Sequence, residues 1–467
     1  MFDLWRGMAE INDATERLEE ATDQTLGVLG GSSSSFWRIR MMRLEDVKAG
    51  ALIQGIEPGE VVRIVASEQI GKDIIVANKP DDPSTIDVLK QAIEINLVNN
   101  GFVKCGTGYQ VDGQLTKQRI REIHSNHRIQ TLHKNNDFIQ EYYDELIKNF
   151  ADGSQVNPSL ISPELIEVKS NSYDSRLFRF ACLLWSVPVS QGFGRRIRFI
   201  VRDRQNGCLI GLFAIGDPVF NLSARDRWID WQFEDRKSGL KHIMDAYVVG
   251  SVPPYSMLIG GKLIAALMAS SEVIEAYNRK YIGKETVIGH TINQAQLVLL
   301  TTTSSMGRSS LYNRLSIPGG PQFVRIGETR GFGHFHFSGE IFESMKEYLE
   351  SVGHPYARGN RFGMGPNWKM RVIRAVLDRI GLDSNNTLNH GIAREVYAIP
   401  LAKNWQAILH GHTTDVSCNT LTADEISNFC LNRWMIPRAT RDTSFSNFDK
   451  RKIMVYLQTD KSTSKWD

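Results

Sequence analysis

The chain has 467 residues, of which 42% are hydrophobic and 23% charged, with a formal net charge of +3. This length exceeds what one hydrophobic core usually serves, so two or three domains are expected. Its apolar runs are shorter than the roughly 20 residues that cross a bilayer, and its acidic N-terminus is unlike a signal peptide, which predicts a cytoplasmic protein without a membrane segment. Five widely spaced cysteines without a CxxC pair argue against a zinc knuckle or a disulfide framework.

Residues 1–30 are predicted to form an N-terminal amphipathic helix, because mostly apolar residues recur at spacings of four and three residues and form one narrow stripe. A Gly/Ser-rich linker follows, and residues 31–85 are expected to contain it together with a small β-barrel-like module of three short strands. Pro58, Gly59 and the turn at 71–73 separate these strands. The stripe consists of Leu4, Met8, Ile11, Thr15 and Leu18.

Residues 86–164 are predicted to be a helical region, because isoleucines and leucines recur among basic and polar residues. Such a segment can lie over nucleic acid, although a solvated helix face is the simpler interpretation. His124 and His127 share a helix face, and His133 follows them. Acidic and cysteine ligands that would complete a metal site are absent nearby, so no metal is predicted.

Residues 165–338 are predicted to form an α/β core with a mixed sheet. "RRIRFIVRD", "CLIGLFAIGDPVF" and "HIMDAYVVGSV" each have the pattern of a strand. A helix, the strand "AQLVLLTTTSS", the short helical "GRSSLYNRL" and the strand "QFVRIGETRGFGHFHFS" follow. A strand, helix, strand order favours a right-handed crossover within one sheet. Residues 339–467 are expected to be a mostly helical C-terminal α+β extension.

The stretch "VVGSVPPYSMLIGGKLIAALMASSEV" joins a strand to a helix. Pro253 and Pro254 lack amide donors and stop the strand, while Gly260 and Gly261 let the backbone approach another group where the helix begins. A helix N-terminus attracts anions, and Lys262 adds a charge, so these two glycines and the lysine are the predicted phosphate- or cofactor-binding residues. The spacing of these residues differs from the GxxxxGK[ST] pattern of a phosphate loop, so NTP hydrolysis is not expected.

The same arrangement resembles the pantetheine-phosphate loop of GNAT acetyltransferases, which implies a GNAT-like mixed sheet and an acyl-CoA or nucleotide phosphate at this turn. The sequence departs from the family's Arg/Gln-x-x-Gly-x-Gly/Ala pattern, since Met257 and Lys262 fall at its outer positions. Acetyl transfer is therefore doubtful, because function depends on the site and not on the fold.

The segment "GRRIRFIVRDRQNG" contains five arginines and one acid, Asp203. Clustered guanidinium groups are typical of phosphate binding, although charged strand edges also prevent unwanted pairing. "SSMGRSSLYNRL" adds two more cations beside serines that could bind phosphate or simply cap a helix. The predicted nucleic-acid contacts are Arg195, Arg196, Arg198, Arg202, Arg204, Arg308 and Arg314.

Two further clusters suggest catalysis. Asp226 and Asp230, in "NLSARDRWIDWQFEDR", could hold Mg²⁺ for phosphodiester chemistry, but ion pairs around the tryptophans of this loop are the commoner outcome. His334 and His336, in "GFGHFHF", would point the same way on a strand and could transfer protons, whereas hydrogen-bonded structural histidines are the simpler alternative. These four residues are the catalytic candidates, and the sequence does not decide whether the chain is an enzyme.

Several blocks resemble the Druantia anti-phage system protein A family. They are "LLWSVPVSQGFGRRIRFIVRD", "LIGLFAIGDPVFNLSARDRWIDW", "MDAYVVGSVPPYSMLIGGKLIAALMASSEV", "TTTSSMGRSSLYNRL" and "ETRGFGHFHF", with "IREIHSNHR" and "NRWMIPRATRD" outside the core. The resemblance implies a role in bacterial antiviral defence, beside other Druantia proteins that include a large helicase-like component. It leaves the chemistry open.

Three hypotheses follow. The first is a nucleic-acid-binding subunit that contacts DNA or RNA and acts with the helicase-like partner. The second is a GNAT-like enzyme that binds an acyl-CoA or nucleotide phosphate at residues 260–262. The third is a structural adaptor of the defence complex. No cofactor is expected under the first hypothesis, and acyl-CoA or Mg²⁺ would follow only from the catalytic alternatives.

Overall fold

The computed structural model describes residues 83–458, apart from 191, 193, 287–289 and 360–365, together with four short strands nearer the N-terminus. The chain divides into two compact units, residues 1–48 with 69–75, and residues 49–68 with 76–467. The predicted helix at residues 1–30 lies outside the described residues. No described helix is long and apolar enough to cross a membrane.

Among the described residues between 31 and 85, four three-residue strands form two separate two-stranded sheets, where the sequence predicts three strands. β1 pairs antiparallel with β2, and β3 pairs with β4. Their bounds are β1 (Leu52–Gln54), β2 (Val61–Arg63), β3 (Ser67–Gln69) and β4 (Ile75–Ala77).

A seven-stranded sheet in the order β12-β13-β11-β10-β9-β8-β7 forms the centre of the fold. β10 and β11 run parallel, joined by a helical crossover, whereas the other neighbours are antiparallel. The predicted mixed α/β class is therefore confirmed, while its GNAT-like character stays a prediction. The strands are β7 (Pro163–Glu167), β8 (Arg196–Asp203), β9 (Leu209–Gly216), β10 (Ile243–Ser251), β11 (Leu299–Thr303), β12 (Val324–Glu328) and β13 (Glu395–Pro400).

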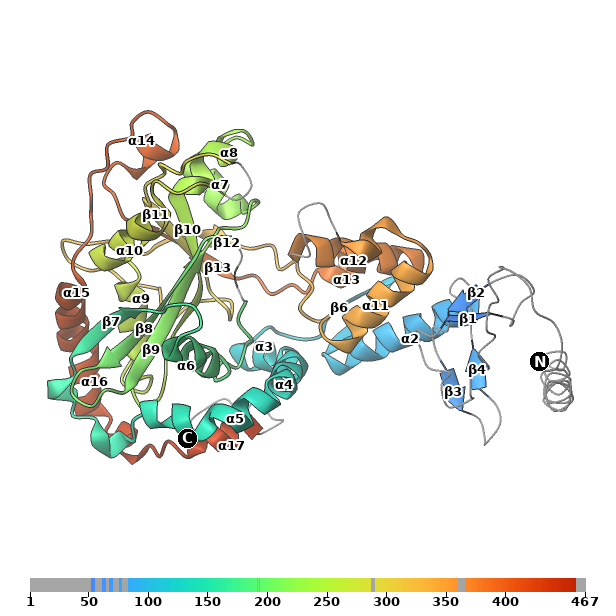
Figure 1. The fold of residues 1–467 in the computed structure, drawn as a ribbon, viewed down its shortest axis with the longest axis horizontal. Coiled ribbons are helices and arrows are strands. Elements are labelled where there is room, and N and C mark those ends of the chain that lie inside the picture. The colour runs from blue at the N-terminus through green and yellow to red at the C-terminus, as the bar shows by residue number, and fades with distance from the viewer. Residues whose placement is uncertain are drawn as a thin grey trace, which may run out of the picture. The chain divides into compact units, whose positions relative to one another are not determined.

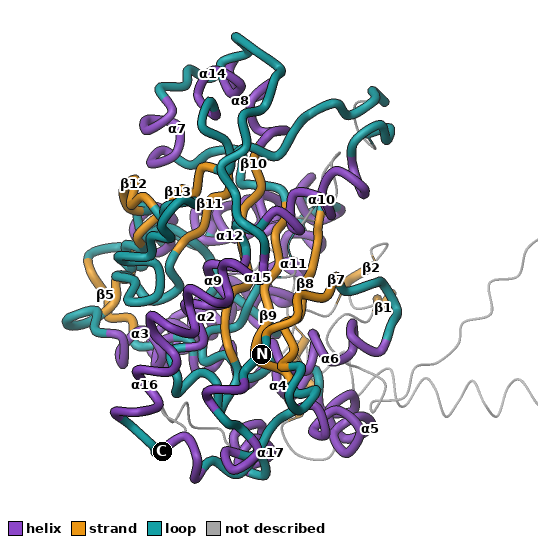
Figure 2. Tube along the Cα trace, turned by 90° about the vertical axis from the view of Figure 1, so that its left-hand side faces the viewer, coloured by secondary structure: helices purple, strands orange, loops and turns teal. Residues whose placement is uncertain are grey.

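Both faces of this sheet are covered, because alternate side chains of its strands enter different hydrophobic clusters. Figure 1 shows α9 and α15 on one side of β8, β9 and β10, and α6 on the other. In the turned view of Figure 2 the orange strands run side by side between helices. The helices of the first face are α9 (Gly260–Leu267), α10 (Ser271–Tyr281), α15 (Ala423–Cys430), the π-helix η7 (Leu431–Met435) and α16 (Ile436–Arg441). The helices of the second cluster are α5 (Asn136–Leu146), α6 (Tyr173–Cys182) and α17 (Lys452–Gln458). A further cluster packs α7 (Ser223–Ile229) and α14 (Trp405–Leu409) against Ile243 and Leu299, with α8 (Asp235–Gly239) beside α14.

A separate hydrophobic cluster joins the segment before β7 to the segment between β12 and β13, and the two lie side by side in Figure 1. It includes a β-hairpin within the region predicted to be helical. The elements are α2 (Pro83–Asn99), β5 (Phe102–Cys105), β6 (Gly108–Val111), α11 (Glu340–Ser351), α12 (Pro366–Arg379) and α13 (Ser384–Leu388). Helices α3 (Lys117–Ile123) and α4 (Ser125–Lys134) continue the chain towards α5.

Three details of the predicted core are wrong. Residues 307–315 form turns instead of a helix, because the Ser309 hydroxyl accepts hydrogen bonds from the amides of Leu311 and Tyr312. Residues 332–337 are not a strand, since Gly331 has a φ of +69° and the chain turns there. The sheet also extends beyond the expected end at residue 338, because β13 inserts between β11 and β12. The remaining domain boundaries stay predictions.

Candidate functional site

The partly buried side chain of Arg195 is held by polar groups. Its Nε donates to Asp217 at 2.6 Å, and its Nη1 donates to the Tyr277 hydroxyl at 2.7 Å and to the Lys241 carbonyl at 2.6 Å. Nη2 reaches two further carbonyl groups. Such a guanidinium group has few donors left for a phosphate.

The other four arginines of this segment are not gathered into one open cluster. Arg202 pairs with Asp174 at 3.0 Å, and the exposed Arg204 lies 3.7 Å from Asp424. Arg198 lies 5.7 Å from the ring centroid of Phe178. Arg196 is exposed at the start of β8. A phosphate-binding role for this strand stays a prediction, and its ion pairs weaken the case for it.

The acidic loop is a network of ion pairs. The Arg225 side chain is fully buried and donates to Asp226 at 2.6 Å, while Arg236 Nε lies 3.0 Å from the other oxygen of that carboxylate. Asp230 has a left-handed backbone and ends α7. Among the described residues no group of three or more His, Cys, Asp or Glu side chains could hold a metal ion. These ion pairs agree with the structural interpretation of the loop, and a catalytic role for Asp226 and Asp230 stays a prediction.

The histidine candidates are not a pair on a strand. His336 is buried, and its Nε2 lies 3.0 Å from the Thr387 carbonyl oxygen. Burial lowers the pKa of His336 to about 3, so the ring is neutral at physiological pH. His334 is partly buried in the same turn. His336 thus fits the simpler of its two interpretations, that of a hydrogen-bonded structural histidine.

The double glycine permits close packing at the start of α9. A Cβ on Gly260 would lie 2.6 Å from the Tyr255 carbonyl oxygen, which already accepts the Gly260 amide. A Cβ on Gly261 would lie 3.1 Å from Cδ1 of Leu311. The groups that the backbone approaches are therefore the preceding turn and the 307–315 segment. Neither glycine lines the nearby pocket.

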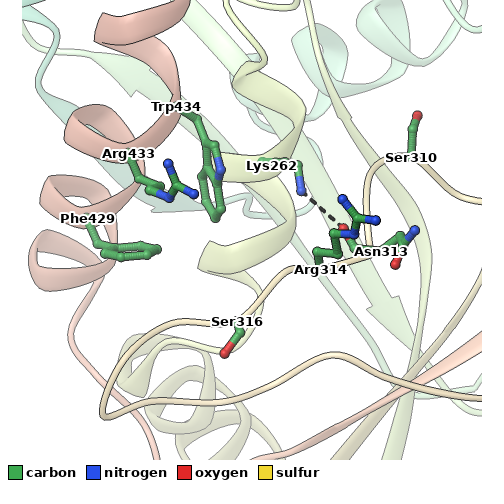
Figure 3. Close-up of a pocket in the computed structure, with 8 residues that line it drawn as sticks. All are labelled: Lys262, Ser310, Asn313, Arg314, Ser316, Phe429, Arg433 and Trp434. Atoms are coloured by element: carbon green, nitrogen blue, oxygen red, sulfur yellow. Dashed lines mark hydrogen bonds between the residues drawn. The ribbon is translucent and has the colours of Figure 1, made fainter.

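An open pocket of about 500 Å³ lies beside α9. Figure 3 shows Phe429, Arg433 and Trp434 along one wall, Asn313 and Arg314 along the opposite wall, and Lys262 between them. Lys262 Nζ donates to the Asn313 carbonyl at 3.3 Å and lies 5.0 Å from the Trp434 ring centroid. Ser310 and Ser316 complete the lining, which contains no acidic residue.

The pocket has a strongly positive character. Within the described residues, Lys262, Arg314 and Arg433 have no carboxylate at ion-pair distance, and both arginines are exposed. Burial, together with the charges of the two arginines, holds the pKa of Lys262 below its usual range. An anionic ligand would relieve this mutual repulsion, because each cation would gain an opposite charge.

Three backbone irregularities meet around this pocket. Ile259, before α9, and Arg314, in the opposite wall, both have a φ of +62°. Arg433 and Trp434 lie in the π-helix η7. A branched residue with positive φ is a genuine outlier, and π-helical turns often occur at functional sites. Such conformations persist only where the surrounding structure maintains them, and they concentrate at ligand-binding sites.

The sequence predicted part of this pocket. Lys262 and Arg314 were among the candidates, but they were assigned to different sites, and Arg308 is exposed outside the lining. Phe429, Arg433 and Trp434 were missed. The only local signal was a tryptophan flanked by arginines in "NRWMIPRATRD", which has no characteristic spacing.

Comparisons with known proteins place the chain in a family. A family model described as Druantia protein DruA matches residues 114–411, and one described as a domain of unknown function, DUF8742, matches residues 43–76. Druantia protein DruA of Escherichia coli strain UMEA 4076-1 is 43% identical over 374 residues, which cover 80% of this chain and 92% of that protein. No solved structure matches. The chain therefore belongs to the Druantia protein DruA family.

Proposed function

We propose that this member of the Druantia anti-phage system is a nucleic-acid-binding subunit, and that it contacts phosphate groups in the pocket formed around Lys262, Arg314 and Arg433. The observation that carries the proposal is the convergence of these three cations with no carboxylate in the lining. Unpaired cations bind nucleic acid by displacing condensed counterions from its phosphates. The proposal includes action beside other proteins of the system, among them a helicase-like component.

The pocket supports this function better than the arginine-rich segment of β8 does. Arg195 and Arg202 would have to break ion pairs with Asp217 and Asp174 before binding a phosphate. Lys262, Arg314 and Arg433 would break none within the described part of the chain. Binding that needs no prior loss of an ion pair retains more of its electrostatic free energy.

The test is the binding of purified protein to labelled single- and double-stranded DNA and RNA over a series of salt concentrations. The triple variant Lys262→Ala, Arg314→Ala, Arg433→Ala should bind at least tenfold more weakly at low salt. Its slope of log affinity against log salt should fall by about 2, because each phosphate contact contributes roughly 0.7 to 0.9.

Arg441→Ala is the matched control, because Arg441 is an exposed arginine on the neighbouring α16, lies outside the pocket lining and donates a hydrogen bond to the Pro437 carbonyl. This variant should bind as the wild type does. A second variant with Arg196 and Arg198 changed to alanine compares the two basic regions directly and leaves Arg195 with its hydrogen bonds to Asp217 and Tyr277. Loss of binding only in this second variant would transfer the interface to β8, and no binding by the wild type would refute the proposal.

A second candidate is an enzyme that takes a small phosphate-bearing molecule, such as an acyl-CoA or a nucleotide. The specific observation in its favour is the pocket volume of about 500 Å³, within the range of small-molecule sites. Such a ligand should saturate the protein and remain bound at moderate salt. Calorimetric titration with acetyl-CoA and with nucleotides distinguishes it from binding that only a polynucleotide produces.

A further inference from the structure

The pocket is too small for a double helix but large enough for one nucleotide. Its volume is about 500 Å³, and small-molecule pockets span roughly 300 to 1,000 Å³. A duplex keeps its bases stacked and paired inside a cylinder far wider than such a space. Any nucleotide that enters the pocket must therefore be unpaired.

The two walls differ in chemistry in a way that matches the two ends of a nucleotide. Phe429 and Trp434 meet edge to face, with ring centroids 5.4 Å apart, and present an aromatic wall. Arg314 occupies the opposite wall, with Lys262 between the walls. Aromatic side chains stack on bases, and cations hold the backbone, in proteins that bind single strands.

Neutral polar groups complete this match. Ser310, Asn313 and Ser316 line the pocket with hydroxyl and amide groups that can both donate and accept hydrogen bonds. Base edges offer the same mixture of donors and acceptors. An anion without a base, such as inorganic phosphate, would use the cations and leave the aromatic wall and these groups unused.

We infer that the pocket takes a single unpaired nucleotide, with its phosphate at Lys262 and Arg314 and its base against Phe429 and Trp434, beside Arg433. This inference rests on the proposed function, and it names the ligand class of the same site. The shared chemistry is one nucleoside monophosphate unit, which could be free, at the end of a strand or exposed within a strand.

The test compares ligands that differ in pairing and in the presence of bases. The ligands are a single-stranded 12-mer of DNA and of RNA, the blunt duplexes of the same sequence, a strand of the same length with abasic sites, and free AMP and dAMP. Trp434→Ala should weaken single-strand binding roughly tenfold or more, since stacking on one aromatic side chain has an effect of that order. Binding of the blunt duplex should change less than twofold.

Two controls separate a lost contact from a damaged fold. Trp434→Phe keeps an aromatic ring and should restore most of the binding, and Phe233→Ala removes an exposed aromatic ring outside the pocket lining and should have no effect. The abasic strand leaves the protein unchanged. It should bind at least fivefold more weakly than the normal strand if the pocket holds a base.

The outcomes distinguish this inference from the function on which it rests. Suppose that the triple cation variant loses binding, that Trp434→Ala binds as the wild type does, and that the abasic strand binds as well as the normal strand. The proposed function then stands and the single-nucleotide inference is wrong. Equal losses for duplex and single strand would also overturn it. If no polynucleotide binds but AMP or dAMP binds in a Trp434-dependent manner, the inference holds for a free nucleotide and the proposed function fails. If none of these ligands binds, both are wrong.

Discussion

Among single residues, Asp245 has an unusual position for a carboxylate. It lies on β10 opposite Thr301 of β11, in the parallel pair of the central sheet. The Thr301 hydroxyl donates a hydrogen bond to it at 2.7 Å. Burial raises the pKa of Asp245 from 3.8 to about 6, although this hydrogen bond and the charge of Arg225 oppose the increase. The ionised form is therefore disfavoured by folding.

Replacing Asp245 with asparagine should stabilise the protein near neutral pH. Because the folded-state pKa is raised, the carboxylate's contribution to stability falls as the pH increases from 3.8 to about 6, and it stays unfavourable above this range. Asparagine keeps an oxygen that accepts the Thr301 hydrogen bond and carries no charge. We expect the free energy of unfolding to rise by about 1–2 kcal/mol at pH 7.5 and by less at pH 5. The pKa shift alone would give a larger value, but solvent screens this partly buried side chain. Urea unfolding at both pH values measures the gain.

Asp226→Asn is the contrasting variant, because Asp226 neutralises the fully buried Arg225 and also pairs with Arg236. Removing one partner of a buried ion pair typically costs about 3–5 kcal/mol. This variant should lose stability at both pH values. A gain for Asp245→Asn that does not vary with pH would show that ionisation of Asp245 is not the cause.

At the scale of elements, the sequence predicted those strands and helices whose position depends on their own local pattern of apolar residues. β8 to β12 and α9 were expected from their apolar periodicity, and they occur where the pattern placed them. β13 was missed because "EVYAIP" forms a strand only by inserting between β11 and β12, a choice that depends on distant partners. Residues 332–337 have strand-like alternation, yet a Cβ on Gly331 would approach the Gly391 carbonyl carbon at 2.7 Å, so this segment turns against another loop.

The pocket was only partly predictable for the same reason. Lys262 and Arg314 are separated by 52 positions, and α15 with η7 joins them from more than 100 residues further along the chain. α15 packs against α9, so the aromatic wall depends on this tertiary contact. Local charge patterns could suggest individual cations, but they could not show which cations share a cavity.

The contact between α9 and the 307–315 segment predicts how the double glycine affects binding. Gly261→Val should displace Leu311, and with it the wall that carries Asn313 and Arg314, because even a Cβ atom would lie 3.1 Å from Leu311 Cδ1. We expect a loss of nucleic-acid affinity of about fivefold with a modest fall in Tm. Overpacking of this kind typically costs about 1–3 kcal/mol.

Two smaller substitutions check this explanation by thermal unfolding and by the binding assay. Gly261→Ala should be milder, since the end of a leucine side chain can move by the few tenths of an ångström required. Gly260→Ala should reduce Tm more than Gly261→Ala does, because its Cβ would meet a backbone oxygen at 2.6 Å. Unchanged affinity in a folded Gly261→Val protein would show that α9 does not position the opposite wall.

At the scale of the whole described fold, a histidine-rich junction lies between the α2–α13 hydrophobic cluster and the start of β13. His124, His336 and His390 are buried there, and Phe335 contacts all three rings. Arg394 Nη2 lies 3.5 Å from Nε2 of His124, and within the described residues none of these four basic groups has an ion pair with a carboxylate. His127, from α4, is a further partly buried imidazole beside them.

This junction should make the protein sensitive to mild acid. Burial, with nearby positive groups, lowers the pKa to about 2 for His124, about 3 for His336 and His390, and about 4 for His127. Depressed values mean that the unfolded chain takes up protons first, so stability is complete above pH 6.5 and is lost as the pH falls towards the folded-state values. Each histidine adds at most about 1.4 kcal/mol per pH unit to this loss.

Substitution of His336 tests whether the junction causes this loss. His336→Gln retains a donor for the Thr387 carbonyl but cannot be protonated, so urea unfolding between pH 8 and pH 5 should show lower stability at pH 8 and a shallower decline with acid. His290→Gln, at a side chain that is 78% exposed, should leave the decline unchanged. Since the junction lies between the cluster of α2 and α11 to α13 and the start of β13, hydrogen exchange at pH 5 should increase first in α2 and α11 to α13, while the sheet stays protected. An identical decline in wild type and His336→Gln would place the acid-sensitive groups elsewhere in the chain.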